Sequence, residues 1–256
     1  MTAVNLDENT MLWEVVAHHP ASREVLERLG IDYCCHGKRT LQAVAEESGL
    51  SFDKLAEAIR QAIASGDDSD PDERDWTTEP LHALIDKIVE CHHTYTRDQL
   101  KLVDKLLSRV ARVHGDKHGD LLSKLRELFN NLAAEIEHHL YQEEAVVFPH
   151  IEDALGCMAG GPELQICLGF EETVLQLEHE HEEAGRTLDR IRSLTDNFRP
   201  PHDACESFRA LYEALEDVEK DLHKHIHLEN NILFPRAFEL VRTGECCREP
   251  RKGDQK

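Results

Sequence analysis

The sequence predicts an all-α protein, in which an antiparallel four-helix bundle follows a small helical N-terminal domain. Nine prolines and thirteen glycines in 256 residues are few, and Leu, Glu, Ala, Asp and Arg are abundant. From residue 81 onward, apolar residues recur every three or four positions over long stretches that short breaks interrupt. Long amphipathic helices with short connections are typical of an antiparallel bundle.

Residues 1–64 are expected to form the N-terminal domain. Apolar residues recur at helical spacing in four short stretches, and the loop at 30–38 (GIDYCCHGK) lies between the second and the third. Residues 65–80 are acidic, contain proline and show no periodicity, so we interpret them as a linker.

Residues 81–242 are expected to form the bundle, and residues 243–256 a flexible tail that carries Cys246 and Cys247. The breaks fall at residues 114–116, 156–162 and 197–201. The four helical patterns that they separate cover about 81–114, 118–153, 163–196 and 204–242.

A motif occurs twice in the bundle: His-x-x-x-Glu-x-x-x-x-Phe-Pro. It begins at His139, with Glu143 as its carboxylate, and again at His225, with Glu229. A histidine and a carboxylate four residues apart lie one turn above each other on the same side of a helix. Two such helices that face each other would bring two imidazoles and two carboxylates into one cavity.

Helical phase selects two further histidines for the interior. His92 and His181 continue the apolar stripes of the first and third helices, whereas His93, His138, His179, His223 and His227 fall on polar faces and are predicted to be solvated. The predicted metal ligands are therefore His92, His139, Glu143, His181, His225 and Glu229.

This set of donors indicates a metal site. A single histidine on an apolar stripe is usually a hydrogen-bonded core residue, but an unpaired buried carboxylate costs several kcal/mol. A structural zinc site is typically closed and often contains cysteine, whereas nitrogen and oxygen donors in this number suit two iron ions. We expect the glutamates to bridge the two irons, with an oxo or hydroxo bridge in the oxidised form, and open positions for small molecules or for iron release.

Cys34 and Cys35 form a second candidate. They lie beside His36, Lys38 and Arg39, whose positive field is expected to lower a thiol pKa. Redox exchange or iron transfer would follow, and the alternative is that two buried cysteines pack the small domain.

The charge and the N-terminus limit the partners and the location. A net charge of −22 disfavours nucleic acid and anionic membrane surfaces, because phosphate would be repelled. The chain shows no signal-peptide pattern and no apolar segment of about 20 residues, so we expect a soluble, cytoplasmic protein.

The bundle resembles the hemerythrin-like HHE domains through the six predicted ligands, although hemerythrins proper usually have five histidines. Over about residues 8–240 the chain resembles the iron–sulfur cluster repair (RIC) family of di-iron proteins. The supporting motifs are residues 30–37 (GIDYCCHG), 180–185 (EHEEAG) and 228–237 (LENNILFPRA).

The resemblance implies a di-iron protein that helps to restore iron–sulfur clusters damaged by oxidative or nitrosative stress. Iron supply is one mechanism, reduction of nitric oxide at the di-iron centre is another, and an oxygen or redox sensor is a third. Glu135 and Glu180 match acidic residues of an iron or small-molecule path in the family, and the alternative is that they hydrogen-bond to ligand imidazoles. The implied partners are damaged iron–sulfur proteins and nitric oxide or dioxygen, with a homodimer as a candidate assembly.

Overall fold

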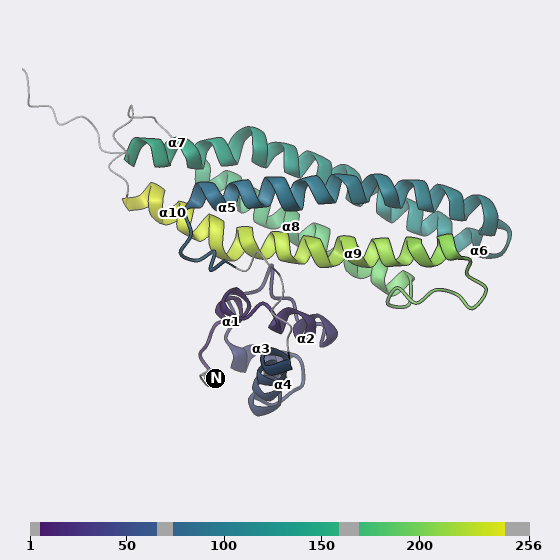
Figure 1. The fold of residues 1–256 in the computed structure, drawn as a ribbon, viewed down its shortest axis with the longest axis horizontal. Helices are drawn as coiled ribbons and strands as arrows, with labels where there is room; N and C mark the ends of the chain where they lie inside the picture. The colour runs from purple at the N-terminus through teal and green to yellow at the C-terminus, as the bar shows by residue number, and fades with distance from the viewer. Residues whose placement is uncertain (1–5, 66–73, 159–168, 244–256) are drawn as a thin grey trace, which may run out of the picture. The chain divides into compact units, whose positions relative to one another are not determined.

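The computed structural model describes residues 6–65, 74–158 and 169–243 (Figure 1). These residues are helical apart from loops, turns and an isolated antiparallel bridge between Met11 and Thr40, which confirms the all-α class. The chain divides into two compact units. The first contains residues 1–84 and 223–235, and the second contains residues 85–222 and 236–256.

The first unit contains four helices from the N-terminal part of the chain: α1 (Leu12–His18), α2 (Ser22–Arg28), α3 (Leu41–Glu47) and α4 (Phe52–Ser65). Thr40 caps α3, since its hydroxyl accepts a hydrogen bond from the Ala43 amide at 3.2 Å. Gly30 follows the end of α2 with φ +68°, a conformation that glycine adopts without strain. The apolar faces of these helices form one core, which Ile226 from the C-terminal segment joins.

The remaining helices follow in chain order, and three of them, α5, α9 and α10, continue from one unit into the other. They are α5 (Leu81–Lys87), η1 (Ile88–His93), α6 (Thr94–Gln142), η2 (Glu143–Val147), α7 (Phe148–Met158), α8 (Phe170–Leu194), α9 (Glu206–Leu228), η3 (Glu229–Leu233) and α10 (Phe234–Thr243).

Helix α6 consists of two helical arms that meet at His118, where φ −121° and ψ 20° interrupt the helix. Arg126 on the second arm donates a hydrogen bond to Ser108 on the first at 2.7 Å and also contacts the Asp104 carboxylate. The arms therefore lie antiparallel and side by side. The predicted break at residues 114–116 falls slightly before the observed one, because the helical conformation continues through Gly115.

The two arms of α6 pack with α8 and α9 around a single apolar core, the predicted four-helix arrangement (Figure 1). Side chains such as Leu107, Leu125 and Phe208 are fully or almost fully buried. Burial of one such side chain stabilises the fold by about 1.5–3 kcal/mol. The turn between α8 and α9 contains three consecutive residues with positive φ, Asp196, Asn197 and Phe198, and it confirms the break predicted there.

Three π-helical turns, η1, η2 and η3, interrupt the bundle helices. A π-turn closes with an i→i+5 hydrogen bond, so it adds about one residue to a helical turn. Each added residue rotates the following side chains by about 100° relative to a continuous α-helix. Each π-turn contains one of the predicted ligands, namely His92, Glu143 or Glu229, and the π-turns change which side chains face the interior.

Within the described residues, none of the helices combines the length and the apolar character that a bilayer span requires.

Candidate metal centre

The second unit brings His139, Glu143 and His181 together in its interior. The Nε2 atoms of the two histidines are 2.7 Å apart, and Nε2 of His139 is 3.2 Å from a carboxylate oxygen of Glu143. The three residues are between 0 and 7 % exposed. Two imidazoles that direct the same nitrogen toward one point, beside a buried carboxylate, form a donor set suited to a transition-metal cation.

His93, and not His92, completes this group. His93 is fully buried, and its Nε2 lies 3.4 Å from Glu143. His92 instead hydrogen-bonds through Nδ1 to Asp221 at 2.9 Å. The prediction that His92 faces the ligands and His93 faces solvent is therefore wrong. The cause is η1: from buried Ile88, an α-helical step of four residues leads to His92, whereas the π-turn's step of five leads to His93.

The second copy of the motif lies in the first unit, at the junction of α9 and η3. Nε2 of His225 is 2.8 Å from a carboxylate oxygen of Glu229, and the two side chains are 1 % and 0 % exposed. The histidine and the glutamate are thus paired one turn apart, as the sequence predicts for this copy.

The buried histidines and glutamates could hold two metal ions. One ligand atom from each of His139, Glu143 and His181 lies within 4.8 Å of the others, and the same holds for His93 and Glu143. The donors are imidazole nitrogens and carboxylate oxygens, which suit iron better than a soft cation.

Glu180 holds the imidazole of His139. Its Oε2 is 2.9 Å from Nδ1 of His139, and its Oε1 accepts a hydrogen bond from Gln176 at 2.9 Å. The hydrogen bond with His139 is the main cause of the lowered pKa of Glu180. Of the two roles that the sequence left open for Glu180, this contact supports hydrogen bonding to a ligand. Glu135 is exposed and lies one position before the buried Ile136.

Glu144, which is not among the predicted site residues, has the corresponding role at His93. Its Oε1 is 2.7 Å from Nδ1 of His93 and accepts a hydrogen bond from Arg97 at 2.8 Å. Burial alone would raise the pKa of Glu144, but the hydrogen bonds from Arg97 and His93 lower it overall. The adjacency of Glu144 to a predicted ligand was the available signal.

The other histidines divide into exposed and covered residues. His138 and His179 are exposed, as predicted, and His223 is half-buried. His227 is fully buried, so its predicted exposure is wrong. In the first unit its ring packs edge-on against Tyr33 at 5.8 Å, and burial lowers the pKa of His227 to about 3. A contact between segments so distant in sequence leaves no trace in local periodicity.

Asn231 connects the second copy of the motif to the cysteine loop within the first unit. Its Nδ2 donates to the backbone carbonyls of Cys34 at 2.9 Å and Tyr33 at 3.3 Å, and it lies 3.2 Å from Nδ1 of His227. Gly37 permits this close approach, because a Cβ there would lie 2.6 Å from the Asn231 side-chain oxygen. The turn that carries His225 and Glu229 is therefore anchored to the loop that carries the two thiols.

Cys34 and Cys35 are free thiols whose sulfurs are 3.8 Å apart. Hydrogen bonding with Cys35, burial and the nearby Asp32 carboxylate raise the pKa of Cys34 well above its usual value. The expectation of a lowered thiol pKa is therefore wrong for Cys34. The neighbouring charges are already engaged, since Arg39 pairs with Glu47 and His36 pairs with Asp32. The second pair, Cys246 and Cys247, lies outside the described residues.

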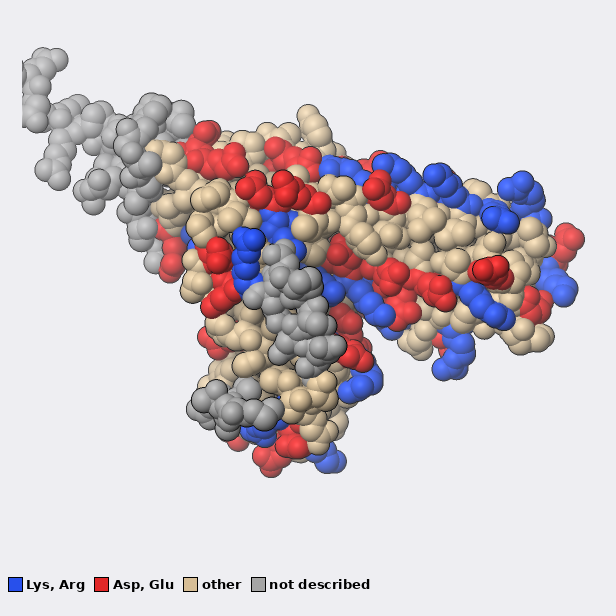
Figure 2. Space-filling model, in the orientation of Figure 1, with Lys and Arg blue, Asp and Glu red and all other residues tan. Residues whose placement is uncertain are grey.

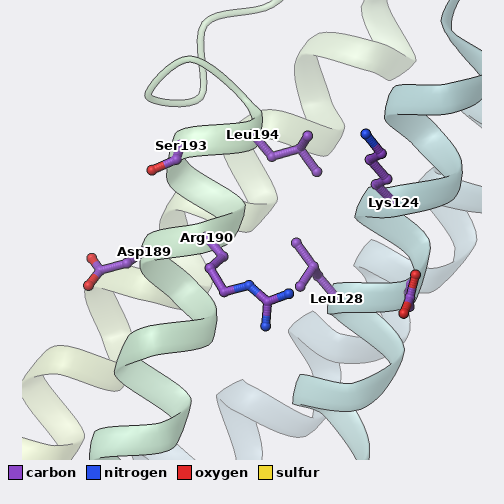
Figure 3. Close-up of a pocket in the computed structure, with 7 residues that line it drawn as sticks. Lys124, Leu128, Asp189, Arg190, Ser193 and Leu194 are labelled. Atoms are coloured by element: carbon purple, nitrogen blue, oxygen red, sulfur yellow. The ribbon is translucent and has the colours of Figure 1, made fainter.

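A shallow groove of about 670 Å³ lies between α6 and α8 (Figure 3). Leu128 of its lining precedes His139 by eleven residues, or about 16 Å along the helix, so the groove is separate from the metal centre. The groove is lined by Lys124, Glu127, Leu128, Asp189, Arg190, Ser193 and Leu194.

On the visible face of the molecule, acidic side chains form several clusters with basic side chains between them, in accord with the net charge of −22 (Figure 2).

Comparison with known proteins agrees with this geometry. Residues 84–237 match the hemerythrin HHE cation binding domain, and residues 8–63 match ScdA_N, a domain of unknown function (DUF542). The iron–sulfur cluster repair protein YtfE of Musicola paradisiaca is 36% identical over 231 residues, which cover 89% of this chain and 95% of that protein.

Two further proteins of that name are similarly related. The YtfE of Edwardsiella ictaluri is 37% identical over 89% of this chain and 96% of its own length. That of Yersinia pseudotuberculosis is 36% identical over 86% of this chain and 92% of its own. The chain therefore belongs to the family of iron–sulfur cluster repair proteins that carry a di-iron hemerythrin HHE domain.

Proposed function

We propose that this protein supplies iron for the repair of iron–sulfur clusters damaged by oxidative or nitrosative stress. The observation that carries the proposal is the buried group of His139, Glu143 and His181, whose ligand atoms lie within 4.8 Å of one another. Bound ferrous ions would serve as exchangeable cargo and as a redox centre. The complete ligand set we propose is His93, His139, Glu143, His181, His225 and Glu229.

The duplicated motif supports the inclusion of His225 and Glu229. In both copies a buried glutamate follows a buried histidine by four residues and begins a π-turn, η2 at Glu143 and η3 at Glu229. Equal local structure argues for equal roles, so each copy would supply one imidazole and one carboxylate as iron ligands.

The surrounding carboxylates orient the ligands. Glu180 and Glu144 each contact the Nδ1 atom of a ligand imidazole, on His139 and His93 respectively. A hydrogen bond at Nδ1 fixes the tautomer that leaves the Nε2 lone pair available for a cation. Each imidazole thereby enters the site already oriented.

The proposal includes Cys34 and Cys35 as the route by which iron leaves. The support is the anchor described above: Asn231, two residues after Glu229, donates a hydrogen bond to the Cys34 carbonyl at 2.9 Å. A change in the position of the ligand turn would therefore be transmitted to the thiol loop. The repair targets would be damaged iron–sulfur proteins, which the protein would bind transiently in the cytoplasm. A homodimer is a candidate assembly.

Nitric oxide reduction is the second candidate function. Glu144 and Glu180 favour it, because each is partly exposed and touches a ligand imidazole, an arrangement that can pass protons from solvent. Nitric oxide would then be a substrate and not merely the cause of the damage.

Transfer of isotopically labelled iron tests the proposal. We expect the iron-loaded protein to restore the activity of a hydratase whose cluster has lost iron, with the label recovered in that cluster. Glu143→Ala should transfer little iron, whereas the exposed His138→Ala should transfer as much as the wild type. Hydratase activity that stays at background while nitric oxide is consumed over many turnovers would overturn iron supply in favour of the second function.

A further inference from the structure

The cysteine loop has the geometry of a metal site of its own. The Sγ atoms of Cys34 and Cys35 are 3.8 Å apart, and Oδ1 of Asp32 is 3.2 Å from the Cys34 sulfur. One ligand atom from each of these three residues lies within 4.8 Å of the others. All three belong to the first unit of the fold.

The sulfur spacing matches that of two ligands on one ion. Two thiolates on a tetrahedral ion, with metal–sulfur bonds of about 2.3 Å, are separated by about 3.8 Å. A disulfide would require about 2.05 Å, and adjacent cysteines cannot reach its usual Cα separation without strain. The observed separation therefore favours chelation of a cation over thiol–disulfide exchange.

The loop is held in shape by contacts that leave the sulfurs facing each other. Oδ1 of Asp32 accepts hydrogen bonds from the backbone amides of Cys34 and Cys35, each at 3.0 Å. Oδ2 of Asp32 is 2.6 Å from Nδ1 of His36, and the Arg39 guanidinium donates to the Asp32 carbonyl at 2.9 Å. Carboxylates that ligate metals are commonly held by hydrogen bonds of their own, as Asp32 is held by His36.

We propose that Cys34, Cys35 and Asp32 form a second metal site, which binds one thiophilic divalent cation separately from the histidine and glutamate ligands. Two thiols lose their protons to solvent as the ion binds, so that one M²⁺ replaces two H⁺ and no electron is transferred. Three ligands leave a fourth tetrahedral position for water or for a donor from another molecule, which makes the ion exchangeable.

The solvent exposure of the three ligand side chains is consistent with exchange of the bound ion. Cys34 is 5 % exposed, Cys35 is partly exposed and the Asp32 side chain is 39 % exposed, so an incoming donor reaches the ion from the Cys35 and Asp32 side. The identification of the cation as Fe(II) rests on the proposed function. The existence of the site rests on the loop geometry alone.

Cobalt(II) is a suitable probe, because Co(II)–thiolate bonds give a charge-transfer absorption that histidine and carboxylate ligands cannot produce. Full-length protein whose histidine and glutamate ligands are already loaded with iron would be titrated with Co(II). We expect the thiolate band to saturate at one equivalent. It should be lost in Cys34→Ser/Cys35→Ser and persist in Cys246→Ser/Cys247→Ser, which controls for the other adjacent pair, and in the exposed Cys91→Ser.

Two single variants keep the test decisive if the double variant does not fold. Cys35→Ser alters only a partly exposed sulfur and should weaken Co(II) binding at least tenfold. Asp32→Asn retains an oxygen for the two amides but loses the charge, and it should weaken binding by about 10-fold or more.

A thiolate band that survives Cys34→Ser/Cys35→Ser, or no band in wild-type protein that retains its iron, would overturn the second site. Neither result bears on the histidine and glutamate ligands, whose iron content is measured separately. Conversely, a normal Co(II) band together with failed iron transfer would contradict the proposed function and leave the loop site standing.

Discussion

Replacement of two adjacent histidines, one at a time, should give opposite results. His93→Ala removes a fully buried imidazole whose Nε2 lies 3.4 Å from Glu143. His92→Ala removes a side chain whose Nδ1 hydrogen-bonds to Asp221 at 2.9 Å. We expect the first to lose iron and the second to lose stability while it keeps its iron.

The structure sets the magnitudes. Loss of a residue that merely supports a ligand lowers metal affinity 10–100-fold, and loss of a ligand should cost more. Iron in His93→Ala should therefore fall from about two per chain to one or fewer. The His92 and Asp221 side chains are 11 % and 18 % exposed, so their hydrogen bond is worth about 1.5–3 kcal/mol. At about 2–4 °C per kcal/mol, His92→Ala should lower the Tm by several degrees.

Metal analysis and thermal unfolding of the two variants, purified in parallel, provide the assay. Unfolding should be followed after iron removal, so that the Tm reports the hydrogen bond and not bound metal. Equal iron loss in both variants, or full iron in His93→Ala, would refute the shift in helical phase that we attribute to η1.

Three further outcomes follow from the contacts. Glu180→Gln should weaken iron binding 10–100-fold by loosening the His139 imidazole, as measured by competition with a chelator; unchanged affinity would remove Glu180 from the site. Gly37→Ala should lower the free energy of unfolding by about 1–3 kcal/mol in denaturant, because its Cβ would meet the Asn231 oxygen at 2.6 Å, and an unchanged midpoint would contradict that packing. Hydrogen bonds from His118 and, to a smaller extent, Lys117 lower the pKa of Asp203 to about 2. The ionised Asp203 carboxylate therefore contributes fully to folding stability above about pH 4, and this contribution is lost as the pH falls through 2. The difference in Tm between the wild type and Asp203→Asn should shrink over that range.

Most of the fold could be predicted from the sequence because the apolar residues of the bundle recur with the period of the α-helix. Buried residues such as Leu107, Leu125 and Leu188 fall on helical repeats, and the breaks between the helices lie near glycine or proline. The duplicated motif also indicated the pairs at Glu143 and Glu229 directly, because a four-residue spacing fixes their relation within one turn.

The wrong predictions concern residues whose environment the local helical period does not determine. The π-turn of η1 adds one residue to the helical turn. Continuation of the α-helical period from Ile88 therefore predicts His92 as the interior residue, whereas the interior residue is His93. His227 lies on a polar face of its own helix, and its burial depends on Tyr33, almost two hundred residues earlier. The raised pKa of Cys34 depends on hydrogen bonding with Cys35, on burial and on Asp32, whose side chain folds back onto the thiols through contacts that its sequence position does not show.

The metal content and absorption spectrum of freshly purified protein, prepared without added metal, test the central claim most directly. The account predicts about two irons per chain and the spectrum of a carboxylate-bridged di-iron centre, both lost in Glu143→Ala. Stoichiometric zinc in place of iron, a single iron per chain, or full iron in Glu143→Ala would contradict it.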